Sequence, residues 1–229
     1  MKRLRFLGTS IGLMMLLVAC TKDNPNVSLA DYHYDYFPVK LGAYWMYDVV
    51  EISHDQNAAI EHDTISYQLK TEIGDTLIDN EGRITNRFYR YKRNTSFDSW
   101  VLTDVWTTIL VDNRAELVDE NIRKVVLRFP IKANMVWNPN QFNFLASQQA
   151  YYEDIHNPNS VSGFSLDSTV KALSVKELSL VSYAHQYEVY AKKIGLVRKY
   201  YKDLKISNFD TLNILSGKEL YYTLTDYSH

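Results

Sequence analysis

Cysteine is almost absent from this sequence, which has one Cys among 229 residues. A lone Cys cannot form an intramolecular disulfide, so a disulfide-stapled scaffold is excluded. Glycine and proline are also scarce, at 8 and 5 residues, which excludes collagen-like and low-complexity chains. The 46% of residues that are apolar must therefore supply an ordinary hydrophobic core, and the chain is long enough to bury one.

Positive charge is not in excess either. The chain has 25 Lys and Arg residues against 27 Asp and Glu residues, a formal net charge of −2. Binding to a phosphate backbone needs a concentrated positive field, so we expect no nucleic-acid partner. A run of about 20 apolar residues, which a membrane-spanning helix requires, is also missing from the sequence.

The motifs of common enzymes are missing as well. Ser165 follows Gly163 and Phe164 but precedes Leu166 and Asp167, so the second Gly of the G-x-S-x-G nucleophile elbow is lacking. The sequence has no Gly-rich phosphate loop and no H-E-x-x-H zinc motif. We therefore expect a non-enzymatic protein without a cofactor, and the sequence assigns no catalytic and no metal-binding residue.

The N-terminus does carry a recognisable pattern. Lys2, Arg3 and Arg5 precede an apolar run over residues 6–19 that is too short to span a bilayer comfortably. This order of basic, apolar and small residues is typical of a secretory signal peptide. The run ends in Leu-Val-Ala before Cys20, which resembles the box of bacterial lipoproteins. An ordinary secreted protein and an uncleaved anchor are the alternatives, but the uniqueness of Cys20 favours lipidation.

The lipoprotein resemblance implies a mature chain that begins at Cys20 and is anchored in a membrane by acyl chains, such as palmitate, on that residue. Thr21 follows it, rather than the Asp that retains some lipoproteins at the inner membrane, so the resemblance implies the outer membrane. Residues 20–35 include Pro25 and lack apolar periodicity, which predicts a flexible tether. The membrane is thus the first expected partner.

A single β-rich domain is predicted for residues 36–229. Apolar and polar residues alternate, as is typical of strands, over 65–70, 125–129, 183–189 and 220–225. The short spacing between these segments suits antiparallel hairpins rather than βαβ units. We predict an antiparallel sheet curved into a half-barrel or barrel, because a flat sheet of about ten strands would leave exposed edges. A two-layer β-sandwich is the alternative.

Shorter signals lie between the predicted strands. Turn-forming residues occur at 79–82, 112–113, 157–160 and 216–217. Short helical turns are considered at 131–136 or 141–149.

Three segments resemble uncharacterised lipoproteins of Bacteroidota. Residues 36–47, YFPVKLGAYWMY, are similar to their opening pattern YFPL-x-x-G-x-Y-W-x-Y, with Val39 in place of Leu. Residues 190–197, YAKKIGLV, are similar to their later YAKGVGLV, with Lys193 in place of Gly, and residues 220–227 are similar to their closing strand. The resemblance implies a lipid-anchored envelope protein and carries no activity with it.

The first of these segments also has a physical interpretation. Gly42 permits a tight turn, and Trp45 and Tyr47 alternate onto one face of the first strand. We therefore predict that Trp45 belongs to the core, and a Trp45 that grips a ligand is the alternative.

The best metal candidates are His54 and His62, which lie with neighbouring carboxylates in the stretch 53–63. Folded as a hairpin, this stretch could bring two His and two carboxylates together, as zinc would require. We interpret it instead as a solvated loop between strands and predict no metal. A second polar cluster, Glu-Asp-Ile-His at 153–156, is interpreted as a solvated strand end.

Tyrosine is unusually frequent, at 18 residues. Tyr rings on a curved sheet can stack on sugars or line a cavity, but Tyr is also a strand residue that packs its ring in the sheet. The leading hypothesis is a lipid-anchored envelope protein that binds a small molecule, a glycan or another envelope protein. The alternatives are a structural component of an envelope complex and an acyl-chain carrier. The ligand-binding residues cannot be named from the sequence.

Overall fold

The computed structural model describes residues 32–228, so the predicted signal peptide and Cys20 lie outside the described residues. The described chain is β-structure with one short 3₁₀ helix, η1 (Tyr34–Tyr36). Within this range no helix is long and apolar enough to cross a membrane. The strands are β1 (Tyr44–Asp55), β2 (His62–Ile78), β3 (Ile84–Arg93), β4 (Val101–Val111), β5 (Arg114–Asp119), β6 (Ile122–Arg128), β7 (Val136–Trp137), β8 (Ala150–Val161), β9 (Phe164–Leu178), β10 (Ser182–Ala191), β11 (Gly195–Ser207) and β12 (Asp210–Ser228).

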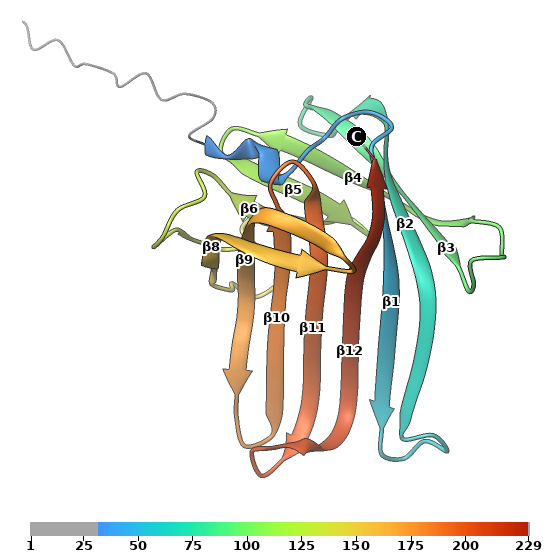
Figure 1. The fold of residues 1–229 in the computed structure, drawn as a ribbon. Coiled ribbons are helices and arrows are strands. Elements are labelled where there is room, and N and C mark those ends of the chain that lie inside the picture. Colours follow the sequence, from blue (N-terminus) through green and yellow to red (C-terminus); the bar gives the residue numbers. More distant parts are fainter. Residues whose placement is uncertain (1–31, 229) are drawn as a thin grey trace, which may run out of the picture.

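All twelve strands belong to one antiparallel sheet, in the order β6-β5-β4-β3-β2-β1-β12-β11-β10-β9-β8-β7. Strands that are neighbours in sequence pair with each other, and one long-range pairing joins β1 to β12. The sheet curls into a nearly closed barrel (Figure 1). The curved all-β sheet predicted from the alternation of apolar and polar residues is therefore confirmed. The described chain forms one sheet and not the alternative two-layer β-sandwich.

The seam of the barrel lies between β6 and the segment around β7 and β8. The Val125 N–H donates to the Pro139 carbonyl (2.9 Å), and the Trp137 indole N–H donates to the Val125 carbonyl (3.0 Å). The Tyr152 hydroxyl accepts from the Arg128 N–H (2.8 Å) and donates to the Arg128 carbonyl (2.6 Å). Side chains of one end of the sheet thus satisfy backbone groups that would otherwise form an exposed edge at the other.

The tight turns follow from residues that accept a left-handed backbone. Glu120 and Asn121, between β5 and β6, have φ of 46° and 65°, and Asn208 and Phe209, between β11 and β12, have φ of 57° and 61°. Two consecutive positive φ values match the hairpin turn whose twist suits the flanking strands. The predicted turns at 79–82 and 112–113 are also confirmed.

Two predicted turns are wrong. Residues 157–160 lie within β8, and residues 216–217 lie within β12. β8 bends through the left-handed residues Asp154 and His156 instead of ending, as bulged strands do. At Gly217 a Cβ atom would lie 2.3 Å from a carbonyl oxygen of β11. These Asn, Pro and Gly residues therefore mark a bend and a close backbone approach inside strands.

No helix forms at 131–136 or 141–149 in the described chain, where single hydrogen-bonded turns occur, such as the bond from the Met135 N–H to the Lys132 carbonyl (3.4 Å). Asparagine side chains satisfy further backbone groups there: Asn140 donates to the Ala146 carbonyl (2.7 Å), and Asn143 donates to the Arg123 carbonyl (2.7 Å). Such bonds offer the backbone an alternative to helical hydrogen bonding.

The segment that precedes β1 packs on the barrel. The Tyr34 ring lies 4.9 Å from the Phe129 ring, and the Tyr34 hydroxyl donates to the Asp112 carbonyl (2.7 Å). Tyr36 is fully buried. Residues 32–35, assigned to the tether from sequence, thus belong to the folded domain. Their contacts could not be foreseen because the segment has no apolar alternation.

The core consists of two clusters within the barrel. Trp45 and Tyr47 belong to the first, and Phe129, Trp137 and Tyr152 belong to the second. Trp45 is 5% exposed, which confirms its predicted place in the core. Strands β1, β2 and β9–β12 continue beyond the barrel, so their hairpins project at the end far from η1 (Figure 1).

Candidate functional site

The barrel interior contains a cavity of about 90 Å³ beside the first core cluster. Its walls are largely aromatic, because alternate residues of β1, β3 and β4 point inward. Trp45, Phe88 and Trp106 line it, and Phe37 from the segment before β1 lines it as well. The polar side chains of Arg90, Glu188 and Lys199 reach the same cavity, together with Tyr47, Thr71, Thr108, Tyr190 and Tyr222.

Arg90, on β3, is the most unusual of these groups. Its side chain is 8% exposed, and its guanidinium carbon lies 3.6 Å from the centroid of the Trp106 ring. One terminal nitrogen donates to the Tyr222 hydroxyl (3.2 Å). The Nε atom has no hydrogen-bond partner among residues 32–228, and its ion-pair contact with Asp104 is 3.7 Å long. A buried donor without an acceptor is costly, so this nitrogen is a ready binding group.

Glu188 and Lys199 face each other across β10 and β11. The Lys199 Nζ lies 2.9 Å from Glu188 Oε1, and the Tyr190 hydroxyl donates to the other oxygen of Glu188 (2.5 Å). Burial alone would raise the pKa of Glu188, but the charge of Lys199 and the bonds from Tyr190 and Lys199 lower it below its ordinary value. Burial alone would lower the pKa of Lys199, but Glu188 raises it. Both groups are therefore charged at neutral pH.

A second hollow, of about 150 Å³, lies on the other side of this ion pair and shares Val126, Glu188 and Lys199 with the first. The Glu188 and Lys199 side chains keep 22% and 30% of their surface accessible. That surface faces the two hollows, which both side chains line. The pair therefore separates two small compartments inside the barrel.

The phenols around the first cavity serve as hydrogen-bond donors. Burial raises the pKa values of Tyr47 and Tyr190, and the nearby charge of Glu188 raises both further. Tyr47 donates to the Leu196 carbonyl (3.0 Å). An acid or base catalyst would need a pKa moved toward neutrality, whereas Glu188, Lys199 and these phenols are moved away from it. The arrangement suits binding of a polar group rather than proton transfer.

The predicted metal candidates are brought together, but in strands rather than in a loop. His54 on β1 pairs with His62 on β2, and their Nδ1 atoms are 2.8 Å apart. His54 is 8% exposed, and its Nε2 lies 3.1 Å from Glu219 Oε1. The interpretation of 53–63 as a solvated loop is thus wrong for His54, which is buried in a strand. His62 is exposed as expected but lies in β2, and only the tip between the two residues is a loop. His54 is buried because β12 covers it with Glu219.

We expect purified protein, prepared without a His tag, to contain no stoichiometric zinc. One hydrogen bond joins both Nδ1 atoms, so the two nitrogens cannot both offer a lone pair to one ion. The described residues contain no group of three or more His, Cys, Asp or Glu suited to a metal. Elemental analysis checks this, with the double variant His54→Ala/His62→Ala as control. About one equivalent of metal that is lost in the variant would contradict it.

The same double variant tests the packing of His54. The sequence predicts an unchanged fold, but the contact between His54 and Glu219 leads us to expect a loss of about 1–2 kcal/mol in unfolding free energy, with the fold retained.

The polar cluster at 153–156 is divided between two contacts. Glu153 forms an ion pair with Lys171 (2.7 Å), and His156 Nδ1 lies 2.8 Å from the Tyr36 hydroxyl. Burial and the nearby charges of His33 and Lys192 lower the pKa of His156. Through its contact with Tyr36, His156 therefore links the segment before β1 to β8.

Several tyrosines stand side by side on the outer face of the sheet. The register places Tyr187, Tyr200 and Tyr221 opposite one another on β10, β11 and β12. The first two rings are stacked, with centroids 4.8 Å apart and planes inclined by 8°, and the Tyr221 ring meets Tyr200 edge-on at 5.2 Å. Because these rings pack against one another, they do not offer a row of free faces for sugar rings.

No signal in the sequence distinguishes Arg90, Glu188 or Lys199 from other charged residues. Charged residues in alternating strands are ordinarily expected on the solvent face, and no motif surrounds these three. Their meeting depends on the register of β3, β10 and β11 within a closed barrel.

Comparison with known proteins adds little to this description. No protein-family model matches the chain. No curated protein matches it either. Among solved structures it is similar to a presumed lipoprotein from Parabacteroides distasonis, a member of Bacteroidota, with a TM-score of 0.38 and 14% identity over 84% of this chain and 98% of that chain. At this TM-score the two folds are only loosely alike.

Proposed function

We propose that this chain is a lipid-anchored protein of the outer membrane, attached through Cys20, that binds a small anionic ligand inside its barrel and catalyses no reaction. The observation that carries the proposal is the buried guanidinium of Arg90, which lines an aromatic cavity and has an Nε without a hydrogen-bond partner among the described residues. Guanidinium groups bind carboxylates well because their donors match the two oxygens.

The size of the cavity limits the ligand. At about 90 Å³ the cavity admits only a ligand with a few non-hydrogen atoms. A carboxylate with a short aliphatic chain fits this description, with its charge at Arg90 and its carbons against Trp45, Phe88 and Trp106. The acyl-chain carrier is not favoured, because ligand pockets for larger molecules measure about 300–1,000 Å³ and Arg90, Glu188 and Lys199 would be in contact with the chain.

The lining of the cavity holds two cations and one carboxylate, because Arg90 and Lys199 line it together with Glu188. Asp104, which is 39% exposed, lies 3.7 Å from the Arg90 Nε. Burial raises the pKa of Asp119, and the nearby charges of Arg90 and Lys199 oppose that rise. A ligand carboxylate would therefore bind Arg90 in competition with Asp104 and Asp119.

Sodium butyrate is the probe that tests this proposal, with butyramide as its neutral isostere. We expect saturable binding of butyrate by NMR titration of the purified protein, and no comparable binding of butyramide. Arg90→Met keeps the packing volume but removes the charge, and should weaken butyrate binding by at least about tenfold, since hydrogen bonds to charged groups contribute about 1.5–3 kcal/mol.

The matched control is Arg93→Met. Arg93 lies on the same strand, but its bonds go to Gln68 and the Ser96 carbonyl, outside the cavity lining. Binding should survive this change. Equal affinity for butyrate and butyramide, or an Arg90→Met variant that binds as well as wild type, would overturn the proposal and favour a purely structural role for the interior charges.

The anchor has its own test. Cys20→Ser should leave an unprocessed or released protein, because Cys20 is the only thiol that could carry the lipid. Metabolic labelling with a radioactive fatty acid, followed by membrane fractionation, checks this in cells. Thr21→Ser, which leaves the thiol in place, is the control and should label normally. A Cys20→Ser chain that still carries the label would refute the anchor.

A further inference from the structure

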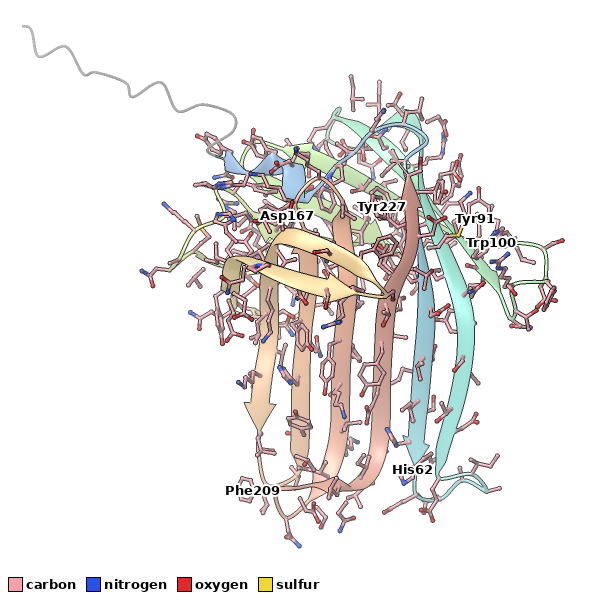
Figure 2. All side chains as sticks on the ribbon, in the orientation of Figure 1. His62, Tyr91, Trp100, Asp167, Phe209 and Tyr227 are labelled. Atoms are coloured by element: carbon pink, nitrogen blue, oxygen red, sulfur yellow. The ribbon has the colours of Figure 1, made fainter. Side chains whose placement is uncertain are left out.

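The end of the sheet far from η1 carries a concentration of exposed apolar side chains. Three hairpins, β1–β2, β9–β10 and β11–β12, end there, and Figure 2 labels His62 and Phe209 at this end. Six apolar residues of these hairpins are each more than 50% exposed, and we call them the apolar tip: Ile60, Leu178, Leu180, Val181, Phe209 and Leu212. Apolar side chains gathered in this way mark interaction surfaces.

The apolar tip is held in place by its backbone. The Phe209 N–H donates to the Leu180 carbonyl (3.2 Å), and the Ile206 N–H donates to the Val181 carbonyl (3.0 Å). The Gln56 N–H donates to a carbonyl of β12 (3.0 Å), which ties the β1–β2 hairpin to its neighbour. The side chains of Leu180, Val181 and Phe209 stay exposed although their backbones are fixed, so ordering costs on binding would be small.

Acidic residues surround the apolar tip. Six carboxylates and three lysines lie exposed on the same hairpins: Asp55, Glu61, Asp63, Glu177, Asp203 and Asp210, with Lys176, Lys205 and Lys218. None of the six carboxylates forms an ion pair with a Lys or Arg within residues 32–228. The carboxylates outnumber the lysines, so this end carries a net negative charge that would attract a basic surface.

The membrane that holds Cys20 does not fit as the occupant. β12 has 19 residues and spans about 60 Å, so the apolar tip lies about that far from the end that carries η1. The twelve residues 20–31 reach at most about 40 Å when fully extended. With the proposed anchor at Cys20, the tip cannot stand on the same bilayer surface. An acidic rim is also repelled by anionic lipid head groups.

We propose that the apolar tip docks a protein partner whose own apolar patch is bordered by Lys or Arg side chains. The apolar residues bury against the patch, and the carboxylates select the partner and its orientation through charge. The chain thereby has a second binding surface, which is separated from the cavity inside the barrel and does not depend on it.

Site-specific photo-crosslinking in cells tests this surface in the full, processed chain. A benzoyl-phenylalanine at Leu212 should give a discrete protein adduct. The same residue at Phe97, which is 96% exposed in the β3–β4 turn, should give none. The double variant Glu61→Lys/Glu177→Lys should reduce the Leu212 adduct by at least about tenfold, because like charges at an interface cost several kcal/mol.

The matched charge control is Glu120→Lys, in the exposed β5–β6 turn, which should leave the adduct unchanged. The crosslinked partner, once purified, should bind the wild-type chain with an affinity that falls as the salt concentration rises. It should bind the Leu212→Ser variant more weakly than wild type. The proposal is overturned if position 212 gives no more adduct than position 97, where Leu212 and Phe97 are replaced in turn. It is also overturned if the charge reversal leaves the adduct yield unchanged, or if the crosslinked protein is a second copy of this chain. Co-sedimentation with vesicles of phosphatidylethanolamine and phosphatidylglycerol, lost in Leu212→Ser, would also overturn it in favour of a membrane.

Discussion

Trp45→Ala will lower the free energy of unfolding by about 3–5 kcal/mol, the range for truncation of a large buried aromatic side chain. Trp45 is 5% exposed, packs near Phe88 and donates its indole N–H to the Ile194 carbonyl. The substitution removes these contacts and enlarges the cavity beside it. Chemical denaturation followed by circular dichroism measures the loss, which is a large share of the stability of an ordinary domain.

Trp100→Ala is the matched control for this prediction. Trp100 stands before β4, is partly exposed and contacts Arg93 through its ring. Trp100→Ala should lower the free energy of unfolding by less than half as much as Trp45→Ala. A Trp45→Ala midpoint indistinguishable from wild type would mean that Trp45 is not a core residue.

Lys199→Met will lower the free energy of unfolding by about 3 kcal/mol at pH 7, because it leaves the largely buried Glu188 carboxylate without its cation. The paired variant Glu188→Gln/Lys199→Met removes both charges and should recover most of this loss. Stability of the single and double variants by urea denaturation, compared in a double-mutant cycle, isolates the coupling between the two side chains. A double variant as unstable as the single one would show that the charges do not act on each other.

The pH dependence of the Lys199→Met variant provides a second readout. In wild type the pKa of Glu188 is below its ordinary value. Its carboxylate therefore contributes fully to the free energy of unfolding above about pH 4–5, and this contribution is lost as the pH falls through the lowered pKa. Without Lys199, burial will instead raise that pKa, and the folded variant will bind a proton that the unfolded chain does not. The difference in stability between wild type and variant should therefore shrink from about pH 7 to about pH 5. A constant difference across this range would contradict the expectation.

The strands were predictable from the sequence where apolar and polar residues alternate along them. Segments such as 65–70 and 220–225 alternate strictly, and both lie inside strands. Turn signals were less informative. Asn, Pro and Gly at 157–160 and 216–217 break regular pairing without ending a strand, since a bulge accommodates the same residues as a turn.

The candidate site could not be predicted in the same way. In β3 the residues Tyr89 and Tyr91 flank Arg90, and a pattern of apolar-in and polar-out would place Arg90 in solvent. The structure reverses this: Tyr89 bonds to the exposed Asp75, while Arg90 points into the barrel. The inward orientation of Arg90 depends on its contacts with residues of distant strands. The alternation of residues within β3 carries no information about those contacts.

The pairing of β1 with β12 has a consequence for the order of folding. β1–β6 and β7–β12 are two meanders made of sequence-adjacent hairpins, and among the described strands the β1–β12 ladder is the strand pairing that joins them, in addition to the hydrogen bonds at the seam. Short loops close with little loss of entropy, so each meander can assemble early, whereas the ladder between the two ends of the domain must wait for the last residues. Until β12 has formed, β1 is therefore an open edge of an incomplete sheet and is available for pairing with a foreign strand. The step most exposed to misassembly is therefore the pairing of β1 with β12.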